Sequence, residues 1–310
     1  MDGKYTIIIP VFFNEGSLKK TMEKLIDNVI SKNGNLEPEV IFIDDGSQDN
    51  SLAELFEIKD NYSFVKIIKF TRNFGQVSAI LAGFKNATGD CIINISADLQ
   101  DPPELITDML HHFFIGGSPL VICERLDRDE SYYRKVTSKF FYKIMQRFTF
   151  KNMPVGGFDF FLISAQIKDI IISKNESNAF LQGQILSTGY KPKFIPYHRA
   201  KREVGKSRWT FGKKIKYLID GILGYSYLPL RLMTIIGIIV SLSGFFYAII
   251  IVIERIFGNT PFSGWAPIMI LILVLSGIQM LMLGIIGEYL WRALDQIRNR
   301  EPYIIEKIFE

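Results

Sequence analysis

Acidic residues gather in two short segments that each follow an apolar, strand-like run. Asp44-Asp45-Gly46-Ser47 follows Val40–Ile43, and Ser96–Glu104 follows Cys91–Ile95. Carboxylate oxygens are the ligands that Mg²⁺ and Mn²⁺ prefer, and such an ion can join a carboxylate to the phosphates of a nucleotide. The pattern therefore predicts a metal-assisted nucleotide site. Each segment alone also fits an ordinary turn and helix cap, so the prediction depends on both lying at one end of one sheet.

The elements that must position these segments alternate between short β-branched runs and helical patterns, which is typical of parallel βαβ units. In such a doubly wound sheet, ligands bind beyond the carboxyl ends of the strands, where both acidic segments are expected. Strands are predicted at Tyr5–Pro10, Val40–Ile43, Val65–Phe70, Cys91–Ile95 and Leu120–Cys123, and helices at Ser17–Ser31, Ser51–Lys59, Gly75–Asn86 and Pro103–Phe114.

The sequence also excludes several function classes. No Gly-x-Gly-x-x-Gly follows the first strand, and no Gly-x-x-x-x-Gly-Lys-[Ser/Thr] occurs, so the dinucleotide and P-loop classes do not apply. A net charge of +4 over 310 residues does not indicate nucleic-acid binding. Cys91, Cys123 and three histidines show no metal-ligand spacing, which excludes a disulfide scaffold and a zinc site.

Two later stretches, Leu232–Ile253 and Ala266–Gly287, contain no charged residue, and each is 22 residues long. About 20 apolar residues in a helix cross a hydrocarbon core of roughly 30 Å. We therefore predict two transmembrane helices. The alternative, a buried hairpin of a soluble protein, is less favoured because such helices usually carry a polar stripe. No cleaved signal peptide is expected, because Met1–Lys4 leads directly into the first strand.

Basic residues flank these stretches on one side only, because the connecting loop Glu254–Trp265 has just Arg255. Cytoplasmic loops carry the excess of Lys and Arg, so both termini are predicted to be cytoplasmic. Lys213, Lys214 and Lys216 beside apolar residues predict a helix lying in the membrane interface. The aromatic segment Tyr132–Phe150 fits either core packing or contact with lipid.

Four motifs together resemble the family 2 glycosyltransferases. They are Pro10-x-x-x-Asn14-Glu15, Asp44-Asp45-Gly46-Ser47, Asp98-Leu99-Gln100-Asp101-Pro102-Pro103 and Arg202-x-x-Gly205-x-Ser207-x-Trp209. Within that family the chain looks like the polyprenyl-phosphate glycosyltransferases, which include dolichyl-phosphate mannose synthase and bacterial undecaprenyl-phosphate glucosyltransferases. The resemblance implies an α/β GT-A fold, Rossmann-like with a mostly parallel sheet, followed by a two-helix transmembrane hairpin. It also implies inverting transfer of a hexose from a nucleotide-diphosphate sugar, with UDP-glucose as the analogous donor, to undecaprenyl phosphate at the cytoplasmic face.

The resemblance assigns roles to the residues of these motifs. The nucleotide-sugar positions are Pro10, Asn14, Glu15, Asp44, Asp45 and Ser96, while Asp98 and Gln100 match the positions that hold Mg²⁺ or Mn²⁺. Ser96 departs from the family, which often has aspartate there; a hydroxyl can donate to a phosphate or hold a metal-bound water. Asp159 matches a position proposed as a base, although a turn residue at a strand end is an equal alternative. The role of Asp101 stays open.

An acceptor phosphate near the bilayer needs cationic partners, and a guanidinium group suits phosphate bidentately. A solvated basic face is the alternative for each candidate, and Arg128 is the weakest of the arginines. The acceptor-phosphate residues are predicted to be Arg125, Arg134, Arg202, Lys206 and Ser207.

The predicted organisation is a catalytic domain over 1–210, a juxtamembrane helix over 211–231, membrane spans over 232–253 and 266–287 around an extracytoplasmic loop at 254–265, and a cytoplasmic tail over 288–310. Expected partners are a flippase, a downstream glycosyltransferase and further copies of the chain, for example in a tetramer. Two alternatives remain. A processive polysaccharide synthase would carry Gln-x-x-Arg-Trp, but Gly205 stands three residues before Arg208. A catalytically inactive membrane scaffold is favoured by Ser96 alone.

Overall fold

The structure is a computed structural model that describes residues 3–126, 150, 152–154, 157–174, 176, 180–200, 220–221, 223–257, 265–298 and 300–310. The chain divides into two units. One comprises Met1–Gly221 together with Asn299–Glu310, and the other comprises Ile222–Arg298.

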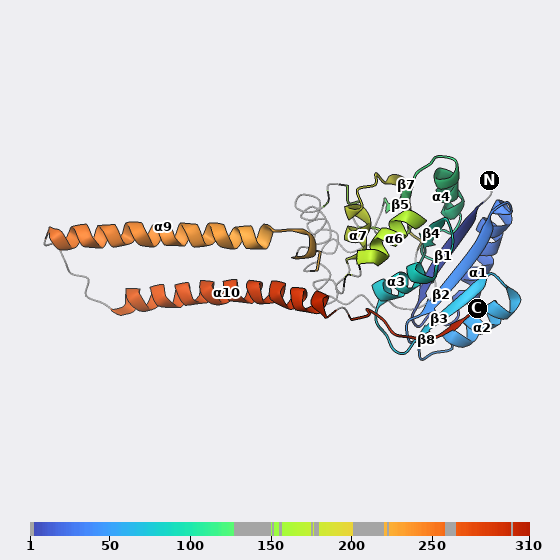
Figure 1. The fold of residues 1–310 in the computed structure, drawn as a ribbon, viewed down its shortest axis with the longest axis horizontal. Coiled ribbons are helices and arrows are strands. Elements are labelled where there is room, and N and C mark those ends of the chain that lie inside the picture. Colours follow the sequence, from blue (N-terminus) through green and yellow to red (C-terminus); the bar gives the residue numbers. More distant parts are fainter. Residues whose placement is uncertain are drawn as a thin grey trace. The chain divides into compact units, whose positions relative to one another are not determined.

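The first unit is built on an eight-stranded sheet in the order β7-β5-β6-β4-β1-β2-β3-β8 (Figure 1). Strands β6 and β8 run antiparallel to their neighbours, and the other pairings are parallel. All five predicted strands are confirmed. The strands are β1 (Lys4–Val11), β2 (Glu37–Asp44), β3 (Val65–Phe70), β4 (Cys91–Asn94), β5 (Leu120–Arg125), β6 (Phe161–Ser164), β7 (Lys193–Tyr197) and β8 (Ile305–Phe309).

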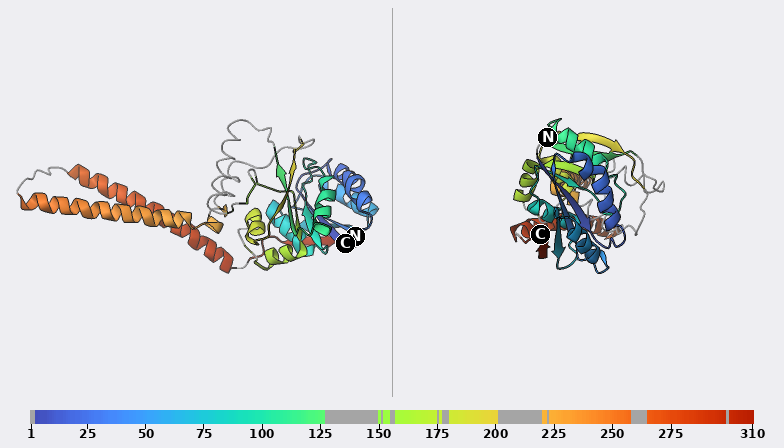
Figure 2. Two further views of the ribbon diagram at one scale, coloured as in Figure 1. Left: turned by 90° about the horizontal axis from the view of Figure 1, so that it is seen from above. Right: turned by 90° about the vertical axis from the view of Figure 1, so that its right-hand side faces the viewer.

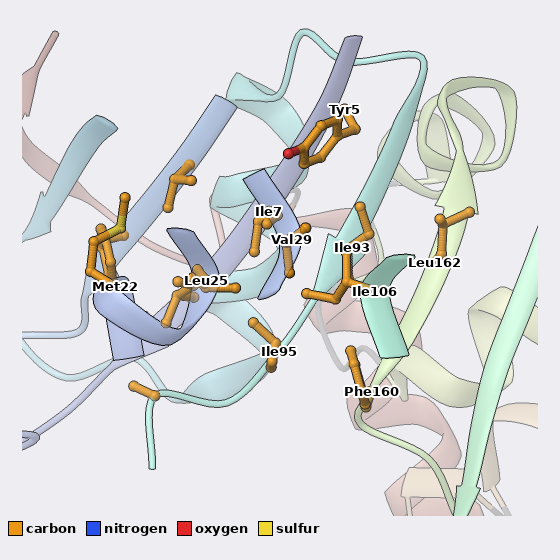
Figure 3. Packing of buried hydrophobic residues seen from close by; sticks show 14 of the residues in the cluster. Tyr5, Ile7, Met22, Leu25, Val29, Ile93, Ile95, Ile106, Phe160 and Leu162 are labelled. Carbon is orange, nitrogen blue, oxygen red and sulfur yellow. The ribbon is translucent and has the colours of Figure 1, made fainter. Parts of the chain in front are cut away.

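Helices cover both faces of this sheet (Figure 2). On one face, Ile7 and Ile9 of β1 pack with α1, α2 and α4; on the other, Ile8 packs with α3, α6 and α7. Figure 3 shows the first of these clusters, in which Met22 and Leu25 of α1 share the core with Ile7 of β1. Successive side chains of a strand point to opposite faces of the sheet. Because helices cover both faces, side chains on both sides are apolar, and the inner strands read as continuous apolar runs. The helices are α1 (Leu18–Leu25), extended by the π-turn η1 (Ile26–Ile30) and the 3₁₀ turn η2 (Ser31–Asn33), then α2 (Ser51–Asn61), α3 (Gln76–Asn86), α4 (Leu105–Phe114), α6 (Ala165–Lys174) and α7 (Leu181–Ser187).

The strand order places a switch point between β1 and β4. Strands β2 and β3 follow on one side of β1, whereas β4 lies on its other side, so the loops after β1 and β4 diverge there. Because β6 is antiparallel to both β4 and β5, the residues just before Phe161 lie at the edge where the parallel strands end. Residues from both halves of this unit therefore meet at one edge.

The sequence analysis did not predict β8, which pairs with β3 after the chain has passed through the second unit (Figure 1). Tyr303 stacks on Phe70 with ring centroids 5.2 Å apart, and Phe309 contacts Phe56 edge-on at 4.8 Å. Lys69 pairs with Glu306 at 2.8 Å. The end of the chain is thus an integral part of the sheet.

The second unit contains the paired helices α9 (Leu228–Ile256) and α10 (Trp265–Ile297). Windows at Leu228–Ile253 and Val274–Ile297 are long and apolar enough to cross a membrane, and most of their described side chains are exposed. At 1.5 Å per residue, the 29 residues of α9 extend about 44 Å, which exceeds a hydrocarbon core of roughly 30 Å. Such exposure is unlike the core helix of a soluble protein.

Candidate functional site

Hydrogen bonds join the loops after β1 and β2 at the carboxyl edge of the sheet. Asn14 N donates to Ser51 Oγ at 2.9 Å, and Phe13 N donates to Ser47 Oγ at 3.1 Å. The Glu15 carboxylate accepts from Asn50 Nδ2 at 2.8 Å. Asn14 and Glu15, both predicted nucleotide-binding residues, thus shape the loop in which they lie. Pro10 stands next to it in β1, opposite Ile43.

Asp45 attaches a third loop, the one after β3. Its carboxylate accepts from Phe74 N at 2.6 Å, Gly75 N at 2.9 Å and Asn73 Nδ2 at 2.7 Å. Gly46 is required beside it, since its φ is +72° and a Cβ there would approach the backbone carbon of Arg72 to 2.6 Å. These three loops, residues 12–17, 44–51 and 71–75, form what we call the loop rim. A contact between Asp45 and a nucleotide stays a prediction.

Asp44 lies at the base of the loop rim and is fully buried. Oδ1 accepts from Ser47 N at 3.1 Å, but the buried Oδ2 has no hydrogen-bond partner among the described residues. Burial raises the pKa of this carboxyl above its ordinary value, outweighing the hydrogen bonds from Ser47. A buried acceptor of this kind is costly unless a ligand supplies a donor.

The loop after β4 brings three predicted residues together. Ser96 Oγ lies 2.7 Å from Asp98 Oδ1 and 2.8 Å from Asp101 Oδ2, and Gln100 N donates to Asp98 Oδ1 at 3.2 Å. Leu99 between them has a φ of 58°, an uncommon conformation for a bulky residue that clusters at ligand sites. Ser17 Oγ donates to Ala97 O at 3.0 Å and so ties this loop to α1.

The oxygen donors of this loop fit a divalent cation. In the part of the chain that the structure describes, no group of three His, Cys, Asp or Glu side chains forms a metal cage. Mg²⁺ does not need one, because it is usually bound by one or two carboxylates with water and substrate phosphates. Gln100 Nε2 donates to Ala200 O at 3.2 Å, so the amide oxygen of Gln100 is not used in this bond. Asp98, Ser96 and Gln100 can therefore hold such an ion together with a diphosphate.

Asp159 reaches the same edge of the sheet because it precedes the antiparallel β6. Arg125 Nη2 donates to Asp159 Oδ2 at 2.9 Å, Gln182 Nε2 approaches Oδ1 at 3.4 Å, and Asn94 Nδ2 donates to the Asp159 carbonyl at 2.6 Å. The Asp159 side chain is still 46% exposed, whereas that of Arg125 is 9% exposed. The carboxylate is thus held in place and open to a ligand.

Tyr197 connects Arg125 to the loop after β4. Its hydroxyl accepts from Arg125 Nε at 3.1 Å and donates to Asp101 Oδ1 at 2.7 Å. Arg199 Nε forms an ion pair with the same carboxylate oxygen at 3.3 Å. Burial is the largest single effect on Arg125 and disfavours its charge, but Asp159, Tyr197 and Asp101 together outweigh burial and raise the pKa of the guanidinium. We call the connected set Asn94, Ser96, Asp98, Asp101, Arg125, Asp159, Gln182 and Tyr197 the side-chain network.

The structure thus places the predicted site residues in two sets at one edge. Asn14, Glu15, Asp44 and Asp45 belong to the loop rim, and Ser96, Asp98, Arg125 and Asp159 belong to the side-chain network, with Gln100 beside them. Other predicted residues lie outside the described residues: Arg134, Arg202, Lys206 and Ser207, with Arg128, Gly205, Arg208, Trp209, Lys213, Lys214, Lys216 and nearly all of Tyr132–Phe150.

The sequence analysis missed Asn94, Gln182 and Tyr197 as members of the site. Asn94 ends a strand two residues before Ser96, and a polar residue near the end of an apolar run was a usable signal. Tyr197 precedes the basic run that begins at Arg199, but nothing in its neighbourhood indicates the contact with Asp101. Gln182 had no local signal, because its partners Phe158 and Asp159 come from a different element.

Comparison with known proteins gives one family. Residues 6–171 match the model of "Glycosyl transferase family 2". The chain is 34% identical over 306 residues to an "uncharacterized glycosyltransferase YkcC" of Bacillus subtilis, covering 99% of this chain and 94% of that one. It is 31% identical over 309 residues to the "prophage bactoprenol glucosyl transferase homolog" of Escherichia coli, covering 98% and 99%. The "bactoprenol glucosyl transferase" of Shigella phage SfII is 30% identical over 311 residues, covering 98% of both chains.

Among solved structures, a mannosyltransferase from Pyrobaculum calidifontis in complex with GDP-Man and Mn²⁺ matches with a TM-score of 0.48 at 14% identity. The match covers 72% of this chain and 64% of that chain. A similarity of this size does not bear on function.

Proposed function

Because this chain belongs to glycosyl transferase family 2, we propose that it transfers a hexose from a nucleotide-diphosphate sugar to a polyprenyl phosphate. The product would be a polyprenyl monophosphate sugar. Relatives named as bactoprenol glucosyl transferases match over 98% of the chain, which supports a lipid acceptor. The observation that carries the proposal is that Asp98, in the loop after β4, and the Arg125–Asp159 pair belong to one side-chain network.

The donor would bind across the loop rim and the loop after β4. Asp44 Oδ2 is a buried acceptor with no partner among the described residues, so an N–H of the nucleobase would satisfy it. Uracil offers such a group, and UDP-glucose is the first donor to test. Pro10, Asn14, Glu15, Asp45 and Ser96 would line or shape the same site.

Asp98, Ser96 and Gln100 would hold Mg²⁺ or Mn²⁺ between the protein and the donor diphosphate. When bound, the ion would offset the charge that develops on the departing diphosphate. The protein's own part is to fix the oxygen donors in advance: Gln100 N and Ser96 Oγ both contact Asp98 Oδ1. Preorganised ligands need no rearrangement when the donor arrives.

The acceptor phosphate would bind beside Arg125, with Arg134, Arg202, Lys206 and Ser207 as further partners. A phosphate oxygen would form the new bond to the anomeric carbon while the bond to the diphosphate breaks, and that electron pair leaves with the nucleoside diphosphate. The phosphate is already anionic, so positioning contributes more than base strength. Asp159, half exposed beside Arg125, would orient the guanidinium and accept the proton that a monoanionic phosphate carries.

Helices α9 and α10 would anchor the enzyme as a membrane hairpin with both termini in the cytoplasm of a bacterial cell. Strand β8 follows α10 and joins the sheet that contains β1, so both ends of the hairpin lead into one folded unit. Two crossings return the chain to the side from which it started, and the basic flanks favour the cytoplasmic side. A flippase, a downstream glycosyltransferase and a homo-oligomer stay predictions from the sequence.

The test is transfer by the purified full chain in lipid nanodiscs. Undecaprenyl phosphate is offered with UDP-glucose, UDP-galactose, UDP-N-acetylglucosamine or GDP-mannose, each with Mn²⁺ and with EDTA. We expect a lipid-linked product from one donor, lost with EDTA, and reduced about 100-fold or more by Asp98→Asn. Asp108→Asn, an exposed aspartate on α4, is the matched control and should keep full activity. Absence of a lipid product with every donor would refute the proposal, and would instead favour a scaffold.

A further inference from the structure

The Tyr197 hydroxyl joins two segments that serve different substrates in the proposed function. It lies 2.7 Å from Asp101 Oδ1, in the loop after β4, and 3.1 Å from Arg125 Nε, at the end of β5. Tyr197 and Asp101 are buried. Arg125 and Tyr197 are also register partners in the parallel pair β5–β7, so the backbone fixes their separation.

The direction of both hydrogen bonds is determined by their partners. A guanidinium group has only donors, and a carboxylate only accepts. The hydroxyl must therefore accept from Arg125 and donate to Asp101, and no other residue type supplies both functions from this ring position. Burial, together with the negative charge of Asp101, raises the pKa of the Tyr197 hydroxyl, so its proton stays in place at neutral pH.

Asp101 continues the connection toward the donor side. Its Oδ2 lies 2.8 Å from Ser96 Oγ, which lies 2.7 Å from Asp98 Oδ1. The serine hydroxyl has one proton and can donate to only one of these carboxylates at a time. A ligand that neutralises Asp98 therefore leaves that proton to Asp101. The hydrogen bonding of Asp101, and through it that of Tyr197, thus depends on whether a ligand is bound at Asp98 in the loop after β4.

We propose that Tyr197 is a positioning residue that couples the two substrates: donor binding at Asp98 commits the Ser96 proton to Asp101, and Tyr197 transmits that change to Arg125, which then meets the acceptor phosphate preorganised. The inference rests on the proposed function, because it takes Asp98 as the donor side and Arg125 as the acceptor side. Binding to a partner that is already ordered costs less conformational entropy, so the coupling has a positive sign.

The test compares lipid binding with and without donor-site ligands. The dissociation constant of undecaprenyl phosphate is measured on the full chain in nanodiscs, first alone and then with saturating UDP and Mn²⁺. We expect the ligands to tighten lipid binding about tenfold in the unaltered chain, within the usual range for coupled sites. Tyr197→Phe keeps the ring against Phe160, whose centroid is 6.1 Å away, and should reduce this factor to about one.

Two further variants separate coupling from loss of structure. Tyr303→Phe is the control, because Tyr303 is also buried and stacked, yet its hydroxyl has no hydrogen bond to any residue that the structure describes; it should keep the tenfold factor. Ser96→Ala removes the next link and should reduce the factor as Tyr197→Phe does. The double variant should then match the single variants, since both interrupt one path.

The inference is overturned if Tyr197→Phe keeps the tenfold factor, or if Tyr197→Phe and Ser96→Ala reduce it independently. Equal melting temperatures of Tyr197→Phe and Tyr303→Phe show that the fold is retained. If Tyr197→Phe does not fold, Ser96→Ala decides, measured at UDP and Mn²⁺ concentrations that saturate the variant, because Ser96 also belongs to the proposed ion site. A failure of the proposed function has a different signature, namely that the unaltered chain makes no lipid-linked sugar from any donor.

Discussion

The loop rim and the side-chain network lie at one edge of one sheet but are held together in different ways. In the loop rim, backbone N–H groups donate to side-chain oxygens, as Phe74 and Gly75 do to Asp45 and Asn14 does to Ser51. In the side-chain network, side chains donate to other side chains, as Arg125 does to Asp159 and Tyr197 does to Asp101. The first set is fixed by the path of the backbone, whereas the second depends on charges that a ligand can change.

This difference suggests a division of labour. A rim tied by backbone amides is formed before any ligand arrives and is suited to recognising one rigid group, the nucleotide. A network of three carboxylates and two hydroxyls connected to one guanidinium can redistribute its protons when a charged ligand binds. We therefore expect substitutions in the rim to change donor affinity alone, and substitutions of Arg125, Asp159 and Tyr197 in the network to change acceptor use and coupling.

The largest effect should come from Arg125→Ala. It removes the partner of Asp159 at 2.9 Å and of Tyr197 at 3.1 Å, and it leaves the buried Asp101 with less compensating charge. Truncating one partner of a buried charge pair typically costs about 2–5 kcal/mol. We expect kcat/KM for undecaprenyl phosphate to fall about 100-fold or more, while the dissociation constant of UDP with Mn²⁺ changes less than about threefold.

Steady-state kinetics with each substrate varied in turn would measure this split. Lys85→Ala is the matched control for loss of a cation, because the Lys85–Glu301 pair at 3.5 Å is exposed on both sides; exposed pairs contribute about 0–1 kcal/mol. An equal loss of donor and acceptor binding in Arg125→Ala would remove the distinction between the two sets.

Asp44→Asn tests the rim and should have an intermediate effect. The buried Oδ2 is the proposed acceptor for a nucleobase N–H. In the asparagine variant the amide oxygen is expected to keep the bond from Ser47 N, so the NH₂ group takes the place of Oδ2, where it cannot accept. We expect the dissociation constant of UDP to rise about 10- to 100-fold, with the KM for lipid unchanged. Isothermal titration with UDP measures the first, and a comparable rise in lipid KM would contradict the separation.

The same variant carries a pH signature. Burial raises the folded-state pKa of Asp44 above its unfolded value, so the stability that the protonated form contributes is present at low pH and is lost as pH rises through the folded pKa. The neutral asparagine has no such loss. Asp44→Asn should therefore gain melting temperature relative to the unaltered chain as pH increases from about 4 to 7. If the melting temperature of Asp44→Asn instead falls relative to that of the unaltered chain as pH rises, the ionised form of Asp44 stabilises the fold.

Much of the loop rim could be predicted from the sequence, because its information is local. Asp44 follows an apolar run directly, Asn14 and Glu15 lie just after the first strand, and in a parallel sheet that position means the ligand-binding edge. The paired helices were predictable for the same reason, since uninterrupted apolar length alone decides whether a helix can cross a bilayer.

Ser96, Asp98, Arg125 and Asp159 were predicted as site residues, but the contacts that join them into the side-chain network, and strand β8, could not be predicted in this way. Hydrophobic periodicity reports which side chains are buried, but it does not report which strand becomes a neighbour. Tyr197 is 96 residues from Asp101, and Asp159 depends on the reversal of β6. Strand β8 is a five-residue edge strand with two charges, and it pairs with β3 across more than 230 residues.

Gln182→Met should have the smallest effect and would sharpen the account of how Asp159 is held. Gln182 Nε2 donates to Phe158 O at 2.7 Å but reaches Asp159 Oδ1 only at 3.4 Å, a weak contact beside the 2.9 Å bond from Arg125. We expect a fall of about three- to fivefold in kcat/KM for lipid. We also expect a loss of about 1 kcal/mol in unfolding free energy, because the Phe158 carbonyl loses its donor. Gln184→Met on the same helix is the control, since Oε1 of that buried side chain has no hydrogen-bond partner among the described residues. A loss larger than that of Arg125→Ala would mean that the amide, and not the guanidinium, positions Asp159.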